Sequence, residues 1–222
     1  MAGIQDFSVF EDDFFGTGSI PTSLTAGSSW KATDTSAAGA PTIANVTTAD
    51  SGEIALTLAA TSEVENICVD FGDVLSFDID KILSVEIRAK VTGCTSGTTI
   101  AFGLQSARND DTNATTLNCM FKMIGATSTT NIVIETDDNV IDNNTVASGQ
   151  TLATVYKRFY IDFSGGKSNI KFYVDGARCA ASTTFSMANT TSSVQPFFQV
   201  SKAANTNADA LTIDYVRIEC KR

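Results

Sequence analysis

The 222-residue sequence predicts an all-β protein, folded as a sandwich of two antiparallel sheets. Apolar and polar residues alternate in many short segments, as strands with one buried and one solvated face require. Clusters of Gly, Asn, Asp and Ser separate these segments at even spacing, whereas helical periodicity is nearly absent. We therefore expect about twelve to fourteen short strands.

The first quarter of the chain is expected to be the least regular. Residues 1–16 are expected to form an N-terminal arm that contains the first strand. Residues 16–52 are rich in Ser, Thr, Ala and Gly, and we interpret them as a long irregular connection with short strands around Trp30 and Ile43. No linker or internal repeat divides the chain, so we expect one domain over residues 1–222.

Clear alternation begins after this connection. The expected strands place their apolar residues on one face, in the ranges 53–60, 67–71, 85–91 and 100–104, and later in 159–163 and 170–175. Asp175-Gly176 follows an alternating run and precedes another β-prone run, which predicts a hairpin turn. The last strand changes phase, because Leu211, Ile213 and Tyr215 share one face and Val216 and Ile218 the other. That change predicts a β-bulge or a strand covered on both faces.

Composition excludes several functions. The formal net charge is −10, which disfavours binding to nucleic acid or to an anionic membrane surface. The sequence has no histidine, so a Ser-His-Asp or Cys-His catalytic site cannot form. The pairs Lys157-Arg158 and Lys221-Arg222 are too few for a nucleic-acid patch, and we interpret them as solvated residues.

The five cysteines indicate a reducing environment. Their number is odd and no Cys-x-x-Cys pair occurs. Cys68 and Cys119 lie within apolar strand segments, so we expect free, mostly buried thiols, with one or more disulfides as the alternative. Met1–Asp6 lacks a basic stretch followed by an apolar run, and no apolar segment is long enough to cross a membrane. We therefore expect a chain that is made in a cytoplasm.

One pair of acidic residues is a candidate for catalysis. Glu135 and Asp137 are two residues apart, so in a strand both carboxylates face the same way. Retaining glycosidases use two carboxyl groups about 5 Å apart. The alternative is a strand that runs into an acidic turn, and we favour it.

Two further candidates concern binding. The Asn/Asp clusters at 109–113 and 137–144 offer oxygen ligands for calcium, but they lack a recognisable ligand spacing, and such residues are common in turns. Exposed aromatic residues can stack on sugars. Trp30 is the sole tryptophan, and Tyr156, Tyr160, Tyr173 and Tyr215 lie in or beside expected strands. Tyr160 and Tyr173 fall on the polar phase of their strands. The alternative for all five aromatic residues is core or edge packing, and we favour it.

Three segments together resemble concanavalin A-like jelly rolls. Residues 9–16, followed by Trp30, resemble their opening strand, which is also found in family 16 glycoside hydrolases. Residues 171–176 look like a hairpin of laminin-G-like and lectin-like domains. Residues 213–218 look like the closing strand, which in such proteins pairs with the first. The resemblance implies a jelly-roll sandwich.

The same resemblance argues against an enzyme. Family 16 hydrolases carry Glu-x-Asp-x-(x)-Glu on one strand, as nucleophile, helper and acid/base. Glu135 and Asp137 match the first two places, but Asn139 or Val140 stands at the third, and neither donates a proton. We therefore expect no catalytic residues, cofactor or metal.

Within this fold, the Ala/Thr/Ser/Asn-rich loops and the absence of histidine resemble virion proteins of tailed bacteriophages. We therefore expect a structural protein of the virion, a capsid decoration (cement) protein on the capsid exterior. Its partners would be the major capsid protein and further copies of itself, with a trimer favoured by capsid symmetry. We also expect that removing residues 1–16 abolishes capsid binding and leaves the sandwich folded. The alternative is a glycan-binding fibre or adhesin module, and a remote alternative is a family 16-like hydrolase.

Overall fold

The computed structural model describes residues 7–15, 20–24, 28–74 and 76–222. These residues form sixteen strands and one short 3-10 helix, η1 (Thr112–Ala114), and none of them is in an α-helix. The all-β prediction is confirmed. The two strands β6 (Phe77–Asp78) and β14 (Ala177–Arg178) contain two residues each. Such short strands show no alternation, which explains why the sequence predicts fewer strands than the structure contains.

The strands form two antiparallel sheets. In spatial order, the first sheet contains β14, β13 (Lys171–Val174), β12 (Lys157–Asp162), β7 (Ile82–Val91), β16 (Ala210–Lys221), β4 (Ile54–Thr57) and β3 (Thr42–Asn45), and β1 (Phe7–Asp12) also pairs with β16. The second contains β11 (Asp142–Thr151), β10 (Asn131–Asp137), β9 (Asn118–Ile124), β8 (Thr98–Gln105), β15 (Ser193–Asn205), β5 (Glu63–Asp70) and β2 (Lys31–Asp34), and β6 also pairs with β15.

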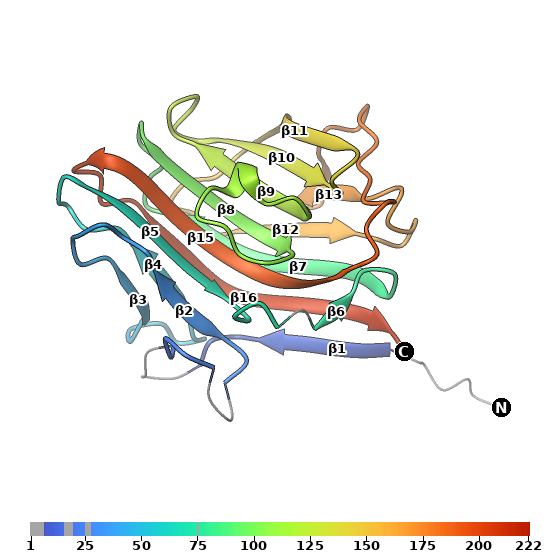
Figure 1. Ribbon diagram of the computed structural model, residues 1–222, viewed down its shortest axis with the longest axis horizontal. Coiled ribbons are helices and arrows are strands. Elements are labelled where there is room, and N and C mark those ends of the chain that lie inside the picture. Colours follow the sequence, from blue (N-terminus) through green and yellow to red (C-terminus); the bar gives the residue numbers. More distant parts are fainter. Residues whose placement is uncertain (1–6, 16–19, 25–27, 75) are drawn as a thin grey trace.

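The core lies between the sheets and is largely aromatic. Figure 1 shows β8 and β9 lying over β7 and β12. At this place Phe102 of β8 meets Phe159 of β12 edge to face, with ring centroids 4.8 Å apart. Phe121 of β9 meets Phe172 of β13 at 5.2 Å. Edge-to-face pairs of this kind stabilise a core beyond the area that they bury.

The first strand pairs with the last, as the resemblance implies. β1 runs antiparallel to β16, from Phe7 opposite Lys221 to Asp12 opposite Val216, and Figure 1 shows the two strands side by side. The Trp30 indole donates a hydrogen bond to the Asp12 carboxylate at 2.8 Å. Phe14 is buried, and its ring centroid lies 5.4 Å from that of Trp30.

These contacts overturn one expectation about the N-terminal arm. Residues 1–6 and 16 lie outside the described residues, but the described part of the arm belongs to the sandwich. Removing residues 1–16 would delete a paired strand and the buried Phe14, so the truncated sandwich cannot be expected to stay folded. Truncation therefore does not separate a binding role of this segment from its structural role.

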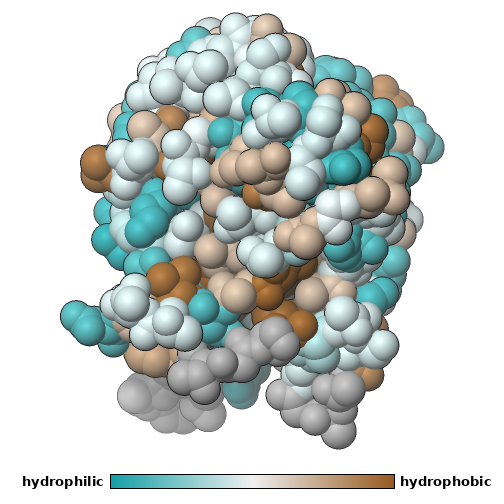
Figure 2. Space-filling model, turned by 90° about the vertical axis from the view of Figure 1, so that its left-hand side faces the viewer, coloured by the Kyte–Doolittle hydropathy of each residue, from teal (hydrophilic) through white to brown (hydrophobic). Residues whose placement is uncertain are grey.

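Residues 16–52 supply one edge strand to each sheet. Residues 16–19 and 25–27 lie outside the described residues, but β2 and β3 form close to Trp30 and Ile43, as predicted. Figure 2 views the sandwich from the side at which these two strands lie, and hydrophobic residues are visible among polar ones on this face. A hollow of about 230 Å³ there is lined by residues of both sheets, including Ile43 and Ile67.

Two local predictions about turns and bulges are confirmed. The pairing of β16 with β7 shifts register between Ile213 and Tyr215, so Asp214 is the extra residue of a bulge. Asp175 and Gly176 have φ angles of 49° and 80° and connect β13 to β14. Two successive positive φ angles are typical of the type I′ turn that matches the twist of a hairpin.

Candidate functional site: a ladder of side chains across the first sheet

The two candidate carboxylates, Glu135 and Asp137, have different surroundings in the structure. Glu135 and Asp137 both lie on β10, but Glu135 is buried beside Lys122 of β9, with its carboxylate 3.1 Å from the Lys122 ammonium. Burial raises the pKa of the Glu135 carboxyl, and the positive charge of Lys122 opposes that shift. The carboxylate of Asp137 instead accepts a hydrogen bond from the backbone of Asn139. Each carboxylate therefore has a structural partner.

The third position of the family 16 pattern lies beyond the strand. β10 ends at Asp137, and Asn139 has a φ of 66° in the turn that follows. Asp138 organises this turn, because its carboxylate accepts hydrogen bonds from the backbone nitrogens of Val140, Ile141 and Asn189. Within residues 137–144, the carboxylates of Asp137 and Asp138 therefore accept hydrogen bonds from backbone nitrogens of the same turn, which leads into β11.

The acidic cluster at 109–113 belongs to a loop that folds back over the second sheet. We call residues 106–117 the β8–β9 loop. Its backbone carbonyls accept hydrogen bonds from amide side chains on the sheet: Asn66 donates to Asp110, and Gln199 to Asn109 and Asp110. The composition of the loop had suggested a solvated turn. In the structure the loop backbone is hydrogen-bonded to the sheet.

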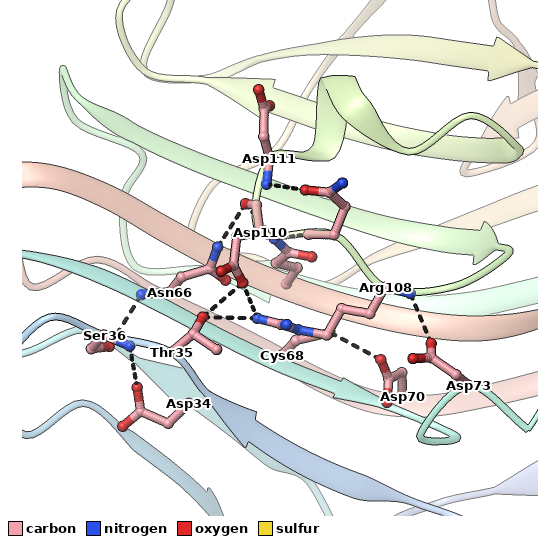
Figure 3. A network of polar contacts seen from close by, with 12 residues as sticks. Asp34, Thr35, Ser36, Asn66, Cys68, Asp70, Asp73, Arg108, Asp110 and Asp111 are labelled. Atoms are coloured by element: carbon pink, nitrogen blue, oxygen red, sulfur yellow. Dashed lines mark hydrogen bonds and ion pairs between the residues drawn. The ribbon is translucent and has the colours of Figure 1, made fainter.

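An arginine holds the near end of this loop in place. Figure 3 shows Arg108 between two sets of partners: its guanidinium reaches Thr35 and Asp110, and its backbone nitrogen donates to Asp73 at 2.8 Å. Cys68 lies beneath, within hydrogen-bonding distance of Asp70. Among the described residues, no group of three or more Cys, Asp or Glu residues is placed to hold a metal ion.

The outer face of the first sheet carries a different arrangement. There, cross-strand partners in register form one row that runs across six strands. We call this row the tyrosine ladder; from edge to edge it consists of Arg178, Tyr173, Tyr160, Glu86, Arg217 and Glu11. Because neighbouring strands lie about 4.8 Å apart, the row is about 24 Å long.

Tyr160 and Tyr173 form the aromatic part of the ladder. They are cross-strand partners on β12 and β13, with ring centroids 6.2 Å apart, and both side chains are partly exposed. The prediction that these two tyrosines face outward is confirmed. Arg178 lies over the Tyr173 ring, with its guanidinium carbon 5.5 Å from the centroid.

Two hollows adjoin this aromatic pair. The larger measures about 340 Å³ and is lined by Glu86, Arg158, Tyr160, Asp162, Tyr173 and Gly176. The second measures about 210 Å³ and is lined by Ser84, Glu86, Tyr160, Arg217 and Glu219. Both hollows share Glu86 and Tyr160, so together they make one shallow groove along the ladder.

Most charges in the groove already have a partner. Glu86 accepts a hydrogen bond from the Tyr215 hydroxyl, and the Arg158 guanidinium lies 3.9 Å from its carboxylate. Burial, together with the bond to Glu86, raises the pKa of Tyr215. Arg217 lies 2.5 Å from Glu219. Among the described residues that line the groove, Asp162 has a hydrogen bond from Ser164 but no ion pair.

The other residues considered from the sequence lie elsewhere or act structurally. Trp30 is buried in the core. Tyr156 lies between the cationic groups of Arg88 and Lys90, at 4.4 and 4.2 Å from its ring centroid. Lys221 is the cross-strand partner of Phe7. All five cysteines are buried and free, as predicted.

Sequence reasoning missed the polar members of the groove. The alternation in 85–91 does place Glu86 on the outer face, and the same reasoning applies to Asp162 in 159–163. What the alternation lacks is the register that brings Glu86 beside Tyr160. Arg158 is exposed, in agreement with its interpretation as a solvated residue, and it also lines the larger hollow.

Comparison with known proteins identifies the fold. No protein-family model matches the sequence, and no curated protein matches it. Solved structures do match, among them the carbohydrate recognition domain of Emp47p, with 12% identity and a TM-score of 0.60 over all of both chains. An endo-acting O-glycanase of the human gut microbiota matches with 12% identity and a TM-score of 0.66, over 96% of this chain and 99% of that chain. The Bacillus licheniformis β-glucanase matches with 17% identity and a TM-score of 0.62, over 98% of this chain and 99% of that chain. The chain therefore has the concanavalin A-like jelly-roll fold of such lectins and glycanases.

Proposed function

We propose that the protein is a non-catalytic carbohydrate-binding module that holds a glycan in the groove along the tyrosine ladder. The observation that carries this proposal is the position of Tyr160 and Tyr173, side by side in a hollow of about 340 Å³ with Glu86 and Asp162. Aromatic rings offer flat apolar surfaces, and charged groups at the rim make strong, oriented hydrogen bonds. Binding sites for small ligands combine these features at a similar volume.

Three similar folds support a carbohydrate ligand, since they belong to a carbohydrate recognition domain, an O-glycanase and a β-glucanase. We infer a module without catalytic activity from residues on and next to β10. There the carboxylate of Glu135 is paired with Lys122, and the position where family 16 enzymes have an acid/base falls in a turn at Asn139. A hydrolase would need both a free nucleophile and a proton donor.

Screening on immobilised glycans, followed by titration calorimetry of each hit, tests the proposal. We expect Tyr160→Ala and Tyr173→Ala each to weaken binding about five- to thirtyfold, because stacking on one ring contributes roughly 1–2 kcal/mol. Phe15→Ala is the matched control, since this exposed aromatic residue lies outside the groove. A protein that binds no glycan, or whose binding survives both tyrosine substitutions, contradicts the proposal.

A second candidate function is structural: a virion protein of a tailed bacteriophage that decorates the capsid exterior, as a trimer, by contacts with the major capsid protein. The observation that favours it is the unpaired edge of β1, among the described strands, and the apolar side chains on this strand. Phe7 and Val9 on this strand are about half exposed, and no described strand pairs with the edge of β1 that faces away from β16. An open edge with apolar side chains is suited to contact with another chain.

Surface substitutions test the second candidate better than truncation does. We expect the double variant Phe7→Ser/Val9→Ser to remain folded, because both side chains are about half exposed, and to lose co-sedimentation with assembled phage capsid shells. Light scattering would report whether the wild-type protein is a trimer. Wild-type protein that stays in the supernatant while the shells pellet would contradict this function.

A further inference from the structure

We infer that the groove takes a glycan that carries ammonium groups, namely one built from amino sugars with free amines. This inference rests on the proposed function and specifies its ligand. The protein has a net charge of −10, so its field attracts cations toward the surface. Within the groove, the described groups that we assign to a cation are the Tyr160 ring and the Asp162 carboxylate, because Glu86 and Glu219 form ion pairs with Arg158 and Arg217 and Arg178 lies over Tyr173.

The carboxylate of Asp162 carries the first part of the inference. Asp162 follows Tyr160 by two residues on β12, so both side chains lie on the outer face. One of its oxygens accepts the backbone hydrogen bond of Ser164 at 2.8 Å. Lys171 is its cross-strand partner on β13, yet the two form no ion pair. The larger hollow therefore contains one carboxylate that forms no ion pair within 4 Å with a described cation.

The remaining charges of this hollow cancel each other. Arg158 lies 3.9 Å from Glu86, and Glu86 is also bonded to Tyr215. The lining of the larger hollow then holds two carboxylates against one guanidinium, which leaves one negative charge. An anionic sugar would be repelled by Asp162, and a neutral sugar would leave this charge uncompensated.

The tyrosines complete the site for a cation. The chain itself places cations over two of its tyrosine rings, Arg178 over Tyr173 and both Arg88 and Lys90 over Tyr156. No described cation lies over the Tyr160 ring, which lines both hollows. An ammonium group between this ring and Asp162 would gain a cation–π contact and an ion pair together. A primary amine on a sugar ring offers such a group next to a face that can stack on tyrosine.

Titration of the full chain with glucosamine oligomers and with N-acetylglucosamine oligomers of equal length tests the inference. Acetylation removes the charge and keeps the sugar ring. At a pH where the amines are protonated, we expect the glucosamine oligomer to bind at least about tenfold more tightly, and Asp162→Asn to remove this preference. Asp50→Asn removes an exposed carboxylate outside the groove and serves as the matched control. Added salt should weaken the binding of the amine form selectively.

The outcomes separate this inference from the proposed function. Equal or tighter binding of the acetylated or of a neutral oligomer overturns the inference and leaves a glycan-binding module. Binding of neither oligomer nor any other glycan overturns both. Binding of a lysine-rich peptide without binding of glucosamine oligomers also overturns the inference, since the ammonium would then come from a protein partner.

Discussion

The Lys122 ammonium lies 3.1 Å from the Glu135 carboxylate, and both side chains are almost fully buried on the outer face of the second sheet. Lys122 also reaches Asn113 of the β8–β9 loop at 2.5 Å. This pair occupies the place where the sequence had suggested a catalytic carboxylate, and it connects two strands to the loop above them.

We expect Glu135→Gln to destabilise the fold by about 3–5 kcal/mol, because it leaves the Lys122 charge buried without its partner. The double variant Lys122→Met/Glu135→Leu should recover most of this loss, since two apolar residues need no counter-charge. Equilibrium unfolding in urea measures both changes. A Glu135→Gln variant as stable as the wild type would show that the pair does not hold the sheet and the loop together.

The N-terminal segment gives a second prediction. Phe14 packs between Trp30 and Phe198, with ring centroids at 5.4 and 6.1 Å. We expect Phe14→Ala to cost about 3–5 kcal/mol, the usual range for removing a buried aromatic ring. Phe15→Ala next to it should change stability by less than about 0.5 kcal/mol, because Phe15 is largely exposed. Thermal unfolding followed by circular dichroism compares the two, and similar losses would contradict the packing described here.

The lowered pKa of Asp138 leads to a prediction of how the free energy of unfolding depends on pH. Burial alone would raise the pKa of Asp138, but its hydrogen bonds from Asn189, Ile141 and Val140 outweigh burial and lower the pKa below the ordinary value of 3.8. The folded state therefore holds this proton less tightly than the unfolded chain does. The resulting stabilisation is complete well above pH 3.8 and is lost as the pH falls through the lowered pKa.

Asp138→Asn tests this dependence. We expect the variant to be less stable than the wild type by about 1–3 kcal/mol near neutral pH, since the charged acceptor is lost. The difference should shrink as the pH is lowered below about 4, because the wild-type carboxyl is then protonated as well. Urea unfolding of both proteins at several pH values provides the measurement. A difference that stays constant with pH would exclude a role for the charge.

The burial of the five cysteines predicts that their thiols react slowly in the folded protein. Burial raises the pKa of Cys94 to about 12 and that of Cys179 to about 11, and it also raises the pKa of the other three thiols. Because the thiolate is the reactive form, we expect native protein at pH 8 to react very slowly with a disulfide reagent. Unfolding in urea should expose all five thiols. Cys220 has the most accessible side chain of the five, so it should react first.

The parts of the structure that were predicted from sequence are those with a local signal. The alternation in 85–91, the Asp175-Gly176 turn and the phase change at Asp214 each depend on a few neighbouring residues, and each is found in the structure. The outward orientation of Tyr160 and Tyr173 follows from strand phase for the same reason.

The groove on the first sheet and the position of the β8–β9 loop over the second sheet depend on residues that are distant in sequence. No local pattern encodes either feature. Glu86 meets Tyr160 only because β7 and β12 pair in one particular register. The Asn/Asp residues of the β8–β9 loop have the composition of a solvated turn. Their backbone is nevertheless held against the sheet, because Asn66 and Gln199, on other strands, donate to the carbonyl groups of Asn109 and Asp110. The exposure of such a loop is decided by its partners on other strands.

The last two strands of the chain occupy the middle of the two sheets. β15 lies between β8 and β5, and β16 lies between β7 and the pair β4 and β1. A growing polypeptide therefore cannot close either layer until translation has delivered Ser193–Lys221. Such late, non-local closure gives folding on the slow millisecond-to-second scale. Until Ser193–Lys221 are available, β5, β7 and β8 lack a neighbouring strand on one side, and these unpaired edges favour aggregation of the incomplete chain.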